Sequence, residues 1–219
     1  IEESVRQIGA LNDQGYHIQI SCNLMAHHMR KPGFAAYLQT VLARFPDINP
    51  QLLQFEILET SALGDLGHIS RLIDECRKLG VSFALDDFGT GYSSLTYLKR
   101  LAAEFLKIDQ SFIRDMPVDP EALAIIEGVL GLASAFGRHT IAEGVETEAH
   151  GKMLLMLGCT LGQGYAIARP MPAEKLTGWL RTWRPYESWR REYTHAAREV
   201  QILHAQVEHR AWLRDLEQA

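Results

Sequence analysis

Leu85-Asp86-Asp87-Phe88-Gly89-Thr90-Gly91-Tyr92-Ser93-Ser94 is the stretch that decides the fold, because an apolar run stops there at two adjacent carboxylates and a glycine-rich loop. The residues just before it, from Val81 to Leu85, have the apolar character of a buried parallel strand. Burying two ionised carboxylates without cations or hydrogen-bond donors would be very costly. We therefore expect Asp86 and Asp87 at the exit of the strand, facing a ligand.

Short apolar runs alternate with amphipathic helical patterns on both sides of this stretch, from Ser4 to about Trp183. The alternation is typical of an α/β protein with parallel strands joined by helices. One helix has clear limits, since Asp119-Pro120-Glu121 predicts its start and Gly137 its end. The predicted strands are His17–Cys22, Leu52–Ile57, Val81–Leu85, Phe105–Ile108, Thr140–Ala142 and Gly164–Ala168.

Polar side chains fall close to the carboxyl ends of nearly all of these strands. They are Asn23, Glu56, Asp86, Asp87, Lys107, Asp109, Glu143 and Gln163. Barrels of eight parallel strands build active sites at this rim, from the ends of several strands. An open doubly wound sheet is the alternative, but it would concentrate ligands at one switch point. The pattern favours the barrel.

The overall composition excludes several classes of protein. The 219 residues, 47% hydrophobic and 22% charged, are ordinary for a globular protein, and the formal net charge of −5 indicates no nucleic-acid partner. No apolar segment has membrane length and the first residues do not resemble a signal peptide, so we expect a cytoplasmic location. Three scattered cysteines argue against a disulfide framework.

Six motifs occur in the order found in EAL domains, the bacterial cyclic-di-GMP phosphodiesterases. They are Asn23-Leu24, Glu56-Ile57-Leu58-Glu59, the stretch Asp86 to Ser94, Lys107-Ile108-Asp109, Ala142-Glu143-Gly144-Val145-Glu146 and Gln163-Gly164-Tyr165. The chain resembles this family from about Ser4 to about Trp183. The resemblance implies a modified (β/α)8 TIM-type barrel over residues 1–183 that binds cyclic-di-GMP and hydrolyses it to 5′-pGpG.

The chain also departs from the family. The Glu-Ala-Leu segment of an early barrel strand, whose glutamate ligates metal in the family, and the substrate-binding arginine that soon follows it are not in this sequence. We therefore expect the first barrel elements to lie upstream of Ile1, with a naturally shortened protein as the alternative. The activity is expected of the complete domain, whose missing glutamate would complete the first metal site, and these 219 residues alone can be inactive. Leu58 stands where the family usually has threonine, and Met25 where it often has serine. Two alternatives to an active phosphodiesterase therefore stay open, namely a catalytically inactive cyclic-di-GMP receptor and a protein-interaction module.

The resemblance assigns the metal ligands. Two divalent cations, Mg²⁺ or Mn²⁺, would stabilise the charge that develops during phosphodiester hydrolysis, and such hard cations choose carboxylate and amide oxygens. Asp86 would bridge the two ions. The expected metal ligands are Asn23, Glu56, Asp86, Asp87 and Glu143.

The remaining motif residues receive catalytic or supporting roles by the same resemblance. Lys107, Glu143 and Gln163 form the expected catalytic set, with Lys107 orienting or polarising the attacking water and Gln163 positioning water or ligands. Glu59 and Glu146 would hold the loop after Asp87, and Asp109 would support the site.

We expect further parts and partners around the barrel. Residues from Ser188 to Ala219 contain no glycine or proline and predict one long helix within a C-terminal extension over residues 184–219. Cyclic-di-GMP, a second copy of the chain and an upstream sensor or regulatory domain are the expected partners.

Overall fold

The fold is taken from a computed structural model, which describes residues 1–59, 66–91 and 95–194. In this part of the chain six parallel strands form one sheet in the order β1 to β6. The strands are β1 (Ile20–Asn23), β2 (Leu53–Leu58), β3 (Ser82–Phe88), β4 (Phe105–Ile108), β5 (His139–Ala142) and β6 (Leu161–Gly162). The sheet curls into an open part of a barrel wall, which confirms the predicted α/β barrel architecture.

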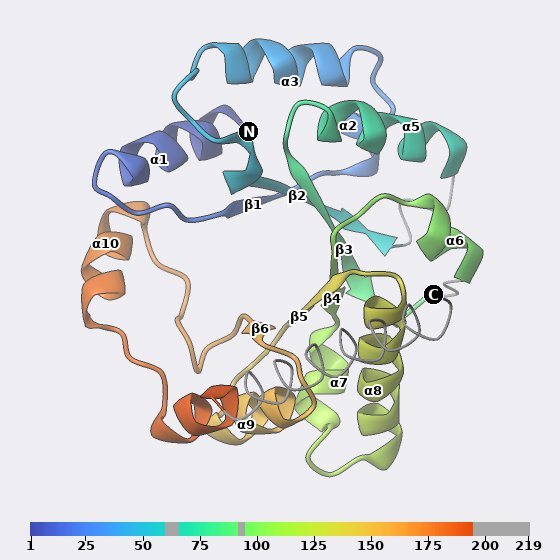
Figure 1. The fold of residues 1–219 in the computed structure, drawn as a ribbon, viewed down its shortest axis with the longest axis vertical. Helices are drawn as coiled ribbons and strands as arrows, with labels where there is room; N and C mark the ends of the chain where they lie inside the picture. The colour runs from blue at the N-terminus through green and yellow to red at the C-terminus, as the bar shows by residue number, and fades with distance from the viewer. Residues whose placement is uncertain (60–65, 92–94, 195–219) are drawn as a thin grey trace, which may run out of the picture.

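Helices connect the successive strands and cover the outside of the sheet (Figure 1). The helix predicted from Asp119 to Gly137 is confirmed as α8, because Asp119 caps its first turn through the Glu121 N–H and Gly137 follows its end with φ 62°. The helices are α1 (Glu2–Asn12), α2 (Ala26–Met29), α3 (Phe34–Ala43), the 3₁₀ helix η1 (Pro50–Leu52), α5 (Leu66–Arg77), α6 (Leu95–Arg100), α7 (Gln110–Asp115), α8 (Pro120–Ala135), α9 (Glu148–Met156) and α10 (Ala173–Thr182).

The outer face of the sheet forms the main hydrophobic core with these helices. Side chains alternate between the two faces of a strand, so every second residue points toward the helices. Several such residues have no exposed surface, and the large ones each gain about 1.5–3 kcal/mol by burial. The large ones are Leu53, Phe55, Ile57, Phe83, Leu85, Leu106 and Ile108. The residues between them, on the inner face, include Glu56, Asp86 and Lys107.

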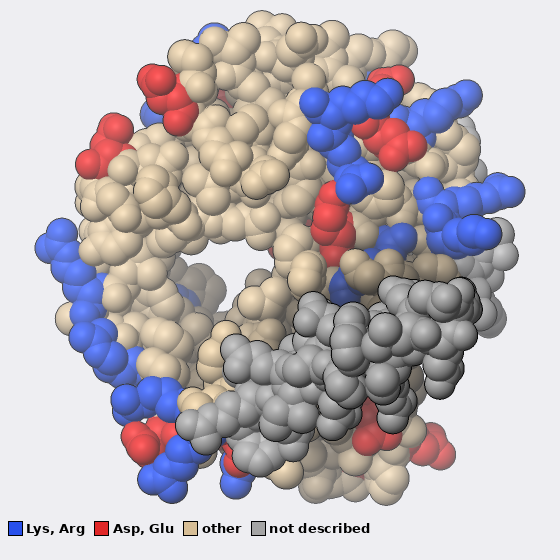
Figure 2. Space-filling model, viewed as in Figure 1, with Lys and Arg blue, Asp and Glu red and all other residues tan. Residues whose placement is uncertain are grey.

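An opening lies inside the curl, between the two edge strands β1 and β6, and the space-filling view shows it passing through the molecule (Figure 2). Helix α10 returns the chain to α1 beside this opening, where Arg181 Nε donates a hydrogen bond of 3.2 Å to the Tyr16 hydroxyl. No helix among the described residues is long and apolar enough to span a membrane.

The chain after Trp183 begins by packing on the barrel. Residues 187–194 are helical, and Trp189 is buried with its Nε1 donating to the Glu148 carbonyl at 2.8 Å. Its ring fills the space beside Gly151 of α9, where an added Cβ would come within 2.3 Å of it. The rest of the long helix predicted for this extension, residues 195–219, lies outside the described residues.

The predicted strand Gly164–Ala168 is wrong. The last strand is β6, at Leu161–Gly162, and the following residues turn, with the N–H groups of Ile167 and Ala168 donating to the Gly164 carbonyl. Gly164 lies against the backbone of Val145, where an added Cβ would come within 2.3 Å of the Val145 nitrogen. This close approach places the chain in a turn that the apolar pattern of the segment does not reveal.

Candidate functional site

Asp86 and Asp87 lie inside a strand, because β3 continues to Phe88 instead of ending before them. Pairing with β4 is irregular between Leu85 and Phe88, and Asp87 has φ 55°, a left-handed conformation that is uncommon for a residue with a side chain. Adjacent side chains of a regular strand point to opposite faces. A bulge relaxes this rule, so both carboxylates can serve the same site.

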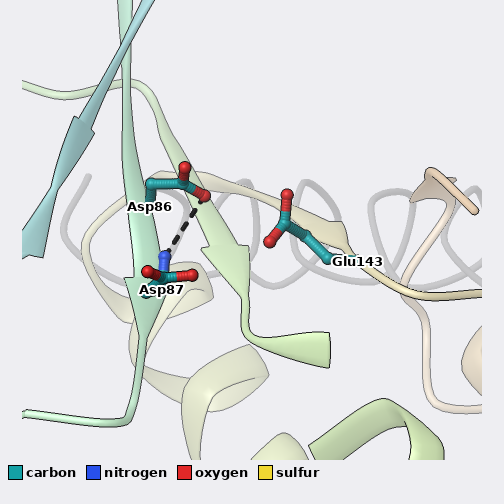
Figure 3. Close-up of side chains that lie close together, drawn as sticks. All are labelled: Asp86, Asp87 and Glu143. Atoms are coloured by element: carbon teal, nitrogen blue, oxygen red, sulfur yellow. Dashed lines mark hydrogen bonds between the residues drawn. The ribbon is translucent and has the colours of Figure 1, made fainter. Parts of the chain in front are cut away.

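Three carboxylates converge at this bulge. Oxygen atoms of Asp86, Asp87 and Glu143 lie within 4.8 Å of one another, and Figure 3 shows the Asp86 and Glu143 side chains extending toward each other from β3 and from the residue after β5. The Asp87 N–H donates to Asp86 Oδ1 at 3.2 Å, which fixes the Asp86 carboxylate against the backbone. The three carboxylates thus form a compact cluster of oxygen atoms that could hold a metal ion.

Lys107 of β4 lies at the centre of the site and is only 2% exposed. Its Nζ contacts Glu56 Oε2 at 2.6 Å, Asp86 Oδ1 at 2.8 Å and Glu143 Oε1 at 2.6 Å. Burial by itself lowers the pKa of Lys107, but the hydrogen bonds to these three carboxylates outweigh it and hold that pKa above the ordinary value. Lys107 therefore carries its proton at neutral pH and acts as a cation.

The site contains more carboxylates than cations, and two of these carboxylates have raised pKa values. Burial raises the pKa of Glu143 against the opposing effect of Lys107. Burial also raises the pKa of Asp87, and the charges of Asp86 and Asp109 add to that shift. A site in which carboxylates are crowded in this way attracts further positive charge, and oxygen ligands suit hard divalent cations.

Asn23 and Gln163 extend the rim to the two edge strands. Asn23 ends β1 beside Glu56 in the register of the sheet, and its side chain is exposed. Gln163 follows β6, where its Nε2 donates to Glu143 Oε1 at 2.9 Å. The structure thus brings Gln163 into contact with the carboxylate cluster and places Asn23 next to it in the sheet.

Glu59 lies against the glycine loop that follows Asp87. It is 1% exposed, and its Oε2 accepts a hydrogen bond of 3.2 Å from the Gly89 N–H. An added Cβ at Gly91 would come within 2.6 Å of Glu59 Oε1, so a larger residue there would require this carboxylate to shift.

The other two supporting residues follow β4 and β5 in the chain. Asp109 caps α7, because its Oδ1 accepts hydrogen bonds from the N–H and the hydroxyl of Ser111. Its carboxylate also contributes to the raised pKa of Asp87. Glu146 is exposed, and its N–H faces His150 Nδ1 at 3.4 Å. Within residues 88–91 of the loop, nothing donates a hydrogen bond to the Glu146 carboxylate.

Two features of the site are not contained in the sequence-based expectations. The first is the bulge at Asp86 and Asp87, for which the available signal is that aspartate tolerates left-handed backbone angles better than most residues. The second is the cap that Asp109 forms, which the sequence Asp109-Gln110-Ser111 at a strand-to-helix junction could have indicated.

The sequence matches a family model described as "EAL domain" over residues 1–170. It is 36% identical over 181 residues to the Pseudomonas aeruginosa protein named cyclic di-GMP phosphodiesterase PA2567, covering 83% of this chain and 31% of the relative. It is 38% identical over 177 residues to the bifunctional diguanylate cyclase/cyclic di-GMP phosphodiesterase MucR of the same species, covering 80% and 26%. The chain thus spans about a third or less of the length of these relatives.

Solved structures resemble the fold as well. A structure titled PaMucR phosphodiesterase, c-di-GMP complex, superimposes with a TM-score of 0.76 at 38% identity, covering 80% of this chain and 71% of that one. The EAL domain of Mycobacterium smegmatis DcpA superimposes with a TM-score of 0.78 at 30% identity, covering 84% and 82%.

Proposed function

The chain belongs to the EAL domain family, and from this premise we propose that it is a cyclic-di-GMP phosphodiesterase that hydrolyses bis-(3′,5′)-cyclic dimeric GMP to 5′-pGpG. The observation that carries the proposal is the convergence of Asp86, Asp87 and Glu143 within 4.8 Å, beside the buried Lys107. The proposal is made for the complete domain that contains this chain, because the metal-ligating glutamate of the family's Glu-Ala-Leu segment is not among these 219 residues.

We propose that the site holds two Mg²⁺ or Mn²⁺ ions. The ligand chemistry fits such ions, because every ligand that the cluster offers is an oxygen and three carboxylates share one small space. Asn23, Glu56 and Asp86 would hold one ion, and Asp86 would bridge to a second held by Asp87 with Glu143 nearby. When bound, two such ions supply a nucleophile at neutral pH and neutralise charge on the phosphoryl and leaving oxygens.

The residues of the chain itself hold the reacting groups in place. Lys107, held between Glu56, Asp86 and Glu143, would offer a positive charge that orients or polarises water or a phosphate oxygen. Glu143 is held on one oxygen by both Lys107 and Gln163, which leaves its other oxygen for a metal ion or water. Glu59 would position the loop after Asp87, and Asp109 would position α7. Glu146 is proposed to support the same loop, without a hydrogen bond to its residues 88–91.

The domain organisation, partners and location of the protein are part of the proposal. We propose that residues 1–183 are the catalytic barrel domain and 184–219 a helical extension, and that the protein works as a homodimer in the cytoplasm under an upstream sensor or regulatory domain. The greater length of the curated relatives supports such additional domains.

The test is direct. The complete domain that contains these 219 residues is incubated with cyclic-di-GMP and Mg²⁺ or Mn²⁺, and the products are separated by chromatography. We expect 5′-pGpG, and we expect EDTA to abolish it. Glu143→Gln should remove most of the turnover, whereas Glu121→Gln, which changes an exposed carboxylate in the first turn of α8, should not.

Two results would contradict the proposal in different ways. Binding of cyclic-di-GMP with metal present but without 5′-pGpG would identify a receptor instead of an enzyme. No nucleotide binding by calorimetry under the same conditions would leave only a protein-interaction role.

A further inference from the structure

Two large apolar side chains are exposed beside the acidic cluster, on its β1–β2 side. Leu58 is the last residue of β2, pairs with Asp86 in the sheet register and is 44% exposed. Met25 follows β1 and is 62% exposed. The Leu24 N–H donates to the Glu56 carbonyl at 2.8 Å, so the two chains still run side by side as they approach Met25 and Leu58.

Leu58 shares the inner face with the acidic residues. Side chains alternate along a strand, so Leu58 lies on the same face as Glu56, two residues earlier, and as its register partner Asp86. Its neighbours Phe55 and Ile57, on the outer face, have no exposed surface. Leu58 is therefore an apolar residue that the core does not use, at a rim whose other side chains are mainly polar.

An apolar surface beside a cluster of polar ligands is typical of a small-molecule site. Neighbouring strands lie about 4.8 Å apart, so Leu58 is one strand spacing from the carboxylate proposed to bridge the metal ions. A phosphodiester held at those carboxylates carries its sugar and base to one side or the other. On the β1–β2 side, the base would meet Leu58 and then Met25.

We propose that Leu58 and Met25 form the face on which one guanine base of the nucleotide lies, and that they favour base-bearing phosphodiesters over small ones. The inference rests on the proposed function, since it needs the phosphodiester at the acidic cluster. A flat purine with two apolar faces suits an aliphatic surface that lacks hydrogen-bonding groups. The pair thus contributes affinity and selectivity, while the carboxylates and Lys107 handle the phosphate.

The experiment measures nucleotide binding and metal binding separately. Three variants are compared with the unmodified chain, namely Leu58→Ser, Met25→Ser and the double variant. Calorimetry measures their binding of cyclic-di-GMP in the presence of Ca²⁺. Electron paramagnetic resonance measures their binding of Mn²⁺ alone. Each single change should weaken nucleotide binding about fivefold to tenfold, and the double change more, because apolar area is lost from the contact. The Mn²⁺ affinity should not change.

The matched control is Val118→Ser. Val118 is 86% exposed in the turn between α7 and α8, so it tests the loss of an exposed aliphatic side chain away from the site. Its cyclic-di-GMP and Mn²⁺ affinities should equal those of the unmodified chain.

Each contrary result has a distinct meaning. An unmodified chain that binds cyclic-di-GMP, with a double variant that binds it equally well, overturns the inference and leaves the proposed function standing. An unmodified chain that binds no nucleotide overturns both. Parallel loss of Mn²⁺ affinity assigns the pair to the metal site and overturns the inference. Loss of self-association in sedimentation velocity, with nucleotide binding unchanged, assigns the face to a second copy of the chain and also overturns it.

Discussion

The two faces of the curved sheet are built from the same strands but follow opposite rules. On the outer face, Phe55, Phe83 and Leu106 are completely buried under helices. On the inner face, the residues next to them include Glu56 and Lys107, which are buried only in contact with opposite charge. The alternation of a strand keeps the two sets apart. A substitution on the outer face should therefore change core packing, and a substitution at the next residue, on the inner face, should change the polar site.

The largest effect should come from the inner face at Asp86. Asp86→Asn keeps the shape of the side chain but removes the charge proposed to bridge both metal ions, so turnover of cyclic-di-GMP should fall by about 10³-fold. Asp74→Asn, at an exposed position of α5, should leave turnover unchanged. Equal turnover in the two variants, measured by chromatography of the product, would remove Asp86 from its bridging role.

The outer face should respond in stability. Phe83 has no exposed surface and its ring centroid lies 5.6 Å from that of Phe55, so Phe83→Ala should lower the free energy of unfolding by about 3–5 kcal/mol. Urea denaturation followed by circular dichroism measures this loss. Phe136→Ala, at the exposed end of α8, should cost on the order of 1 kcal/mol. A similar cost at both positions would mean that the outer face is not the main core.

The inner face should also respond to pH. Burial raises the pKa of both Asp87 and Glu143, so these carboxyls take up protons at a higher pH than ordinary ones and compete with a metal ion there. Mn²⁺ affinity should therefore fall about tenfold or more between about pH 7 and about pH 5. Titrations followed by electron paramagnetic resonance measure the change, and Glu143→Gln should flatten the pH profile. A profile that stays level to about pH 5 would contradict the raised pKa values.

In the absence of metal, the raised pKa values of Asp87 and Glu143 have the opposite effect on folding stability, which they increase as the pH falls. A carboxyl whose pKa is raised on folding binds its proton more tightly in the folded state. Asp87 and Glu143 therefore favour folding more as the pH falls through their raised pKa values, and they favour it less above them.

The smallest effect should come from the edge of the inner face. Gln163→Ala removes the 2.9 Å hydrogen bond to Glu143 Oε1, and Gln163 is exposed, so Mn²⁺ affinity should fall about threefold to tenfold with little change in unfolding. Gln14→Ala, which removes an exposed hydrogen bond from Gln14 to the Ala10 carbonyl in α1, is the control. Unchanged Mn²⁺ affinity in Gln163→Ala would show that Glu143 does not need this partner.

Apolar sequence patterns predict the strands well where the strand residues are buried in the core. Phe105–Ile108 is β4 without change, and the other early strands differ by a few residues at their ends. The last strand was misplaced because the turn at Gly164 depends on the Val145 backbone, which is distant in sequence and close in space. An apolar run cannot show such a contact.

The members of the acidic cluster could be predicted from the sequence, but their arrangement could not. Residue types and motif order indicated Asp86, Asp87 and Glu143 as ligands. The register shift after Leu85 and the contacts of Lys107 with three different strand ends depend on how the sheet curls. Pairing across distant strands is set by tertiary structure, and local periodicity carries no record of it.

Lys107 has a consequence for the order of folding. Its charge leaves water only when carboxylates from residues 56, 86 and 143 surround it, and a buried ammonium that lacks its partners is strongly unfavourable. Contacts between residues so far apart in the chain are slow to form, because the intervening loops must close first. The lysine can therefore be buried only after β2, β3, β4 and β5 have come together, so we expect the rim around Lys107 to be among the last parts of the molecule to assemble.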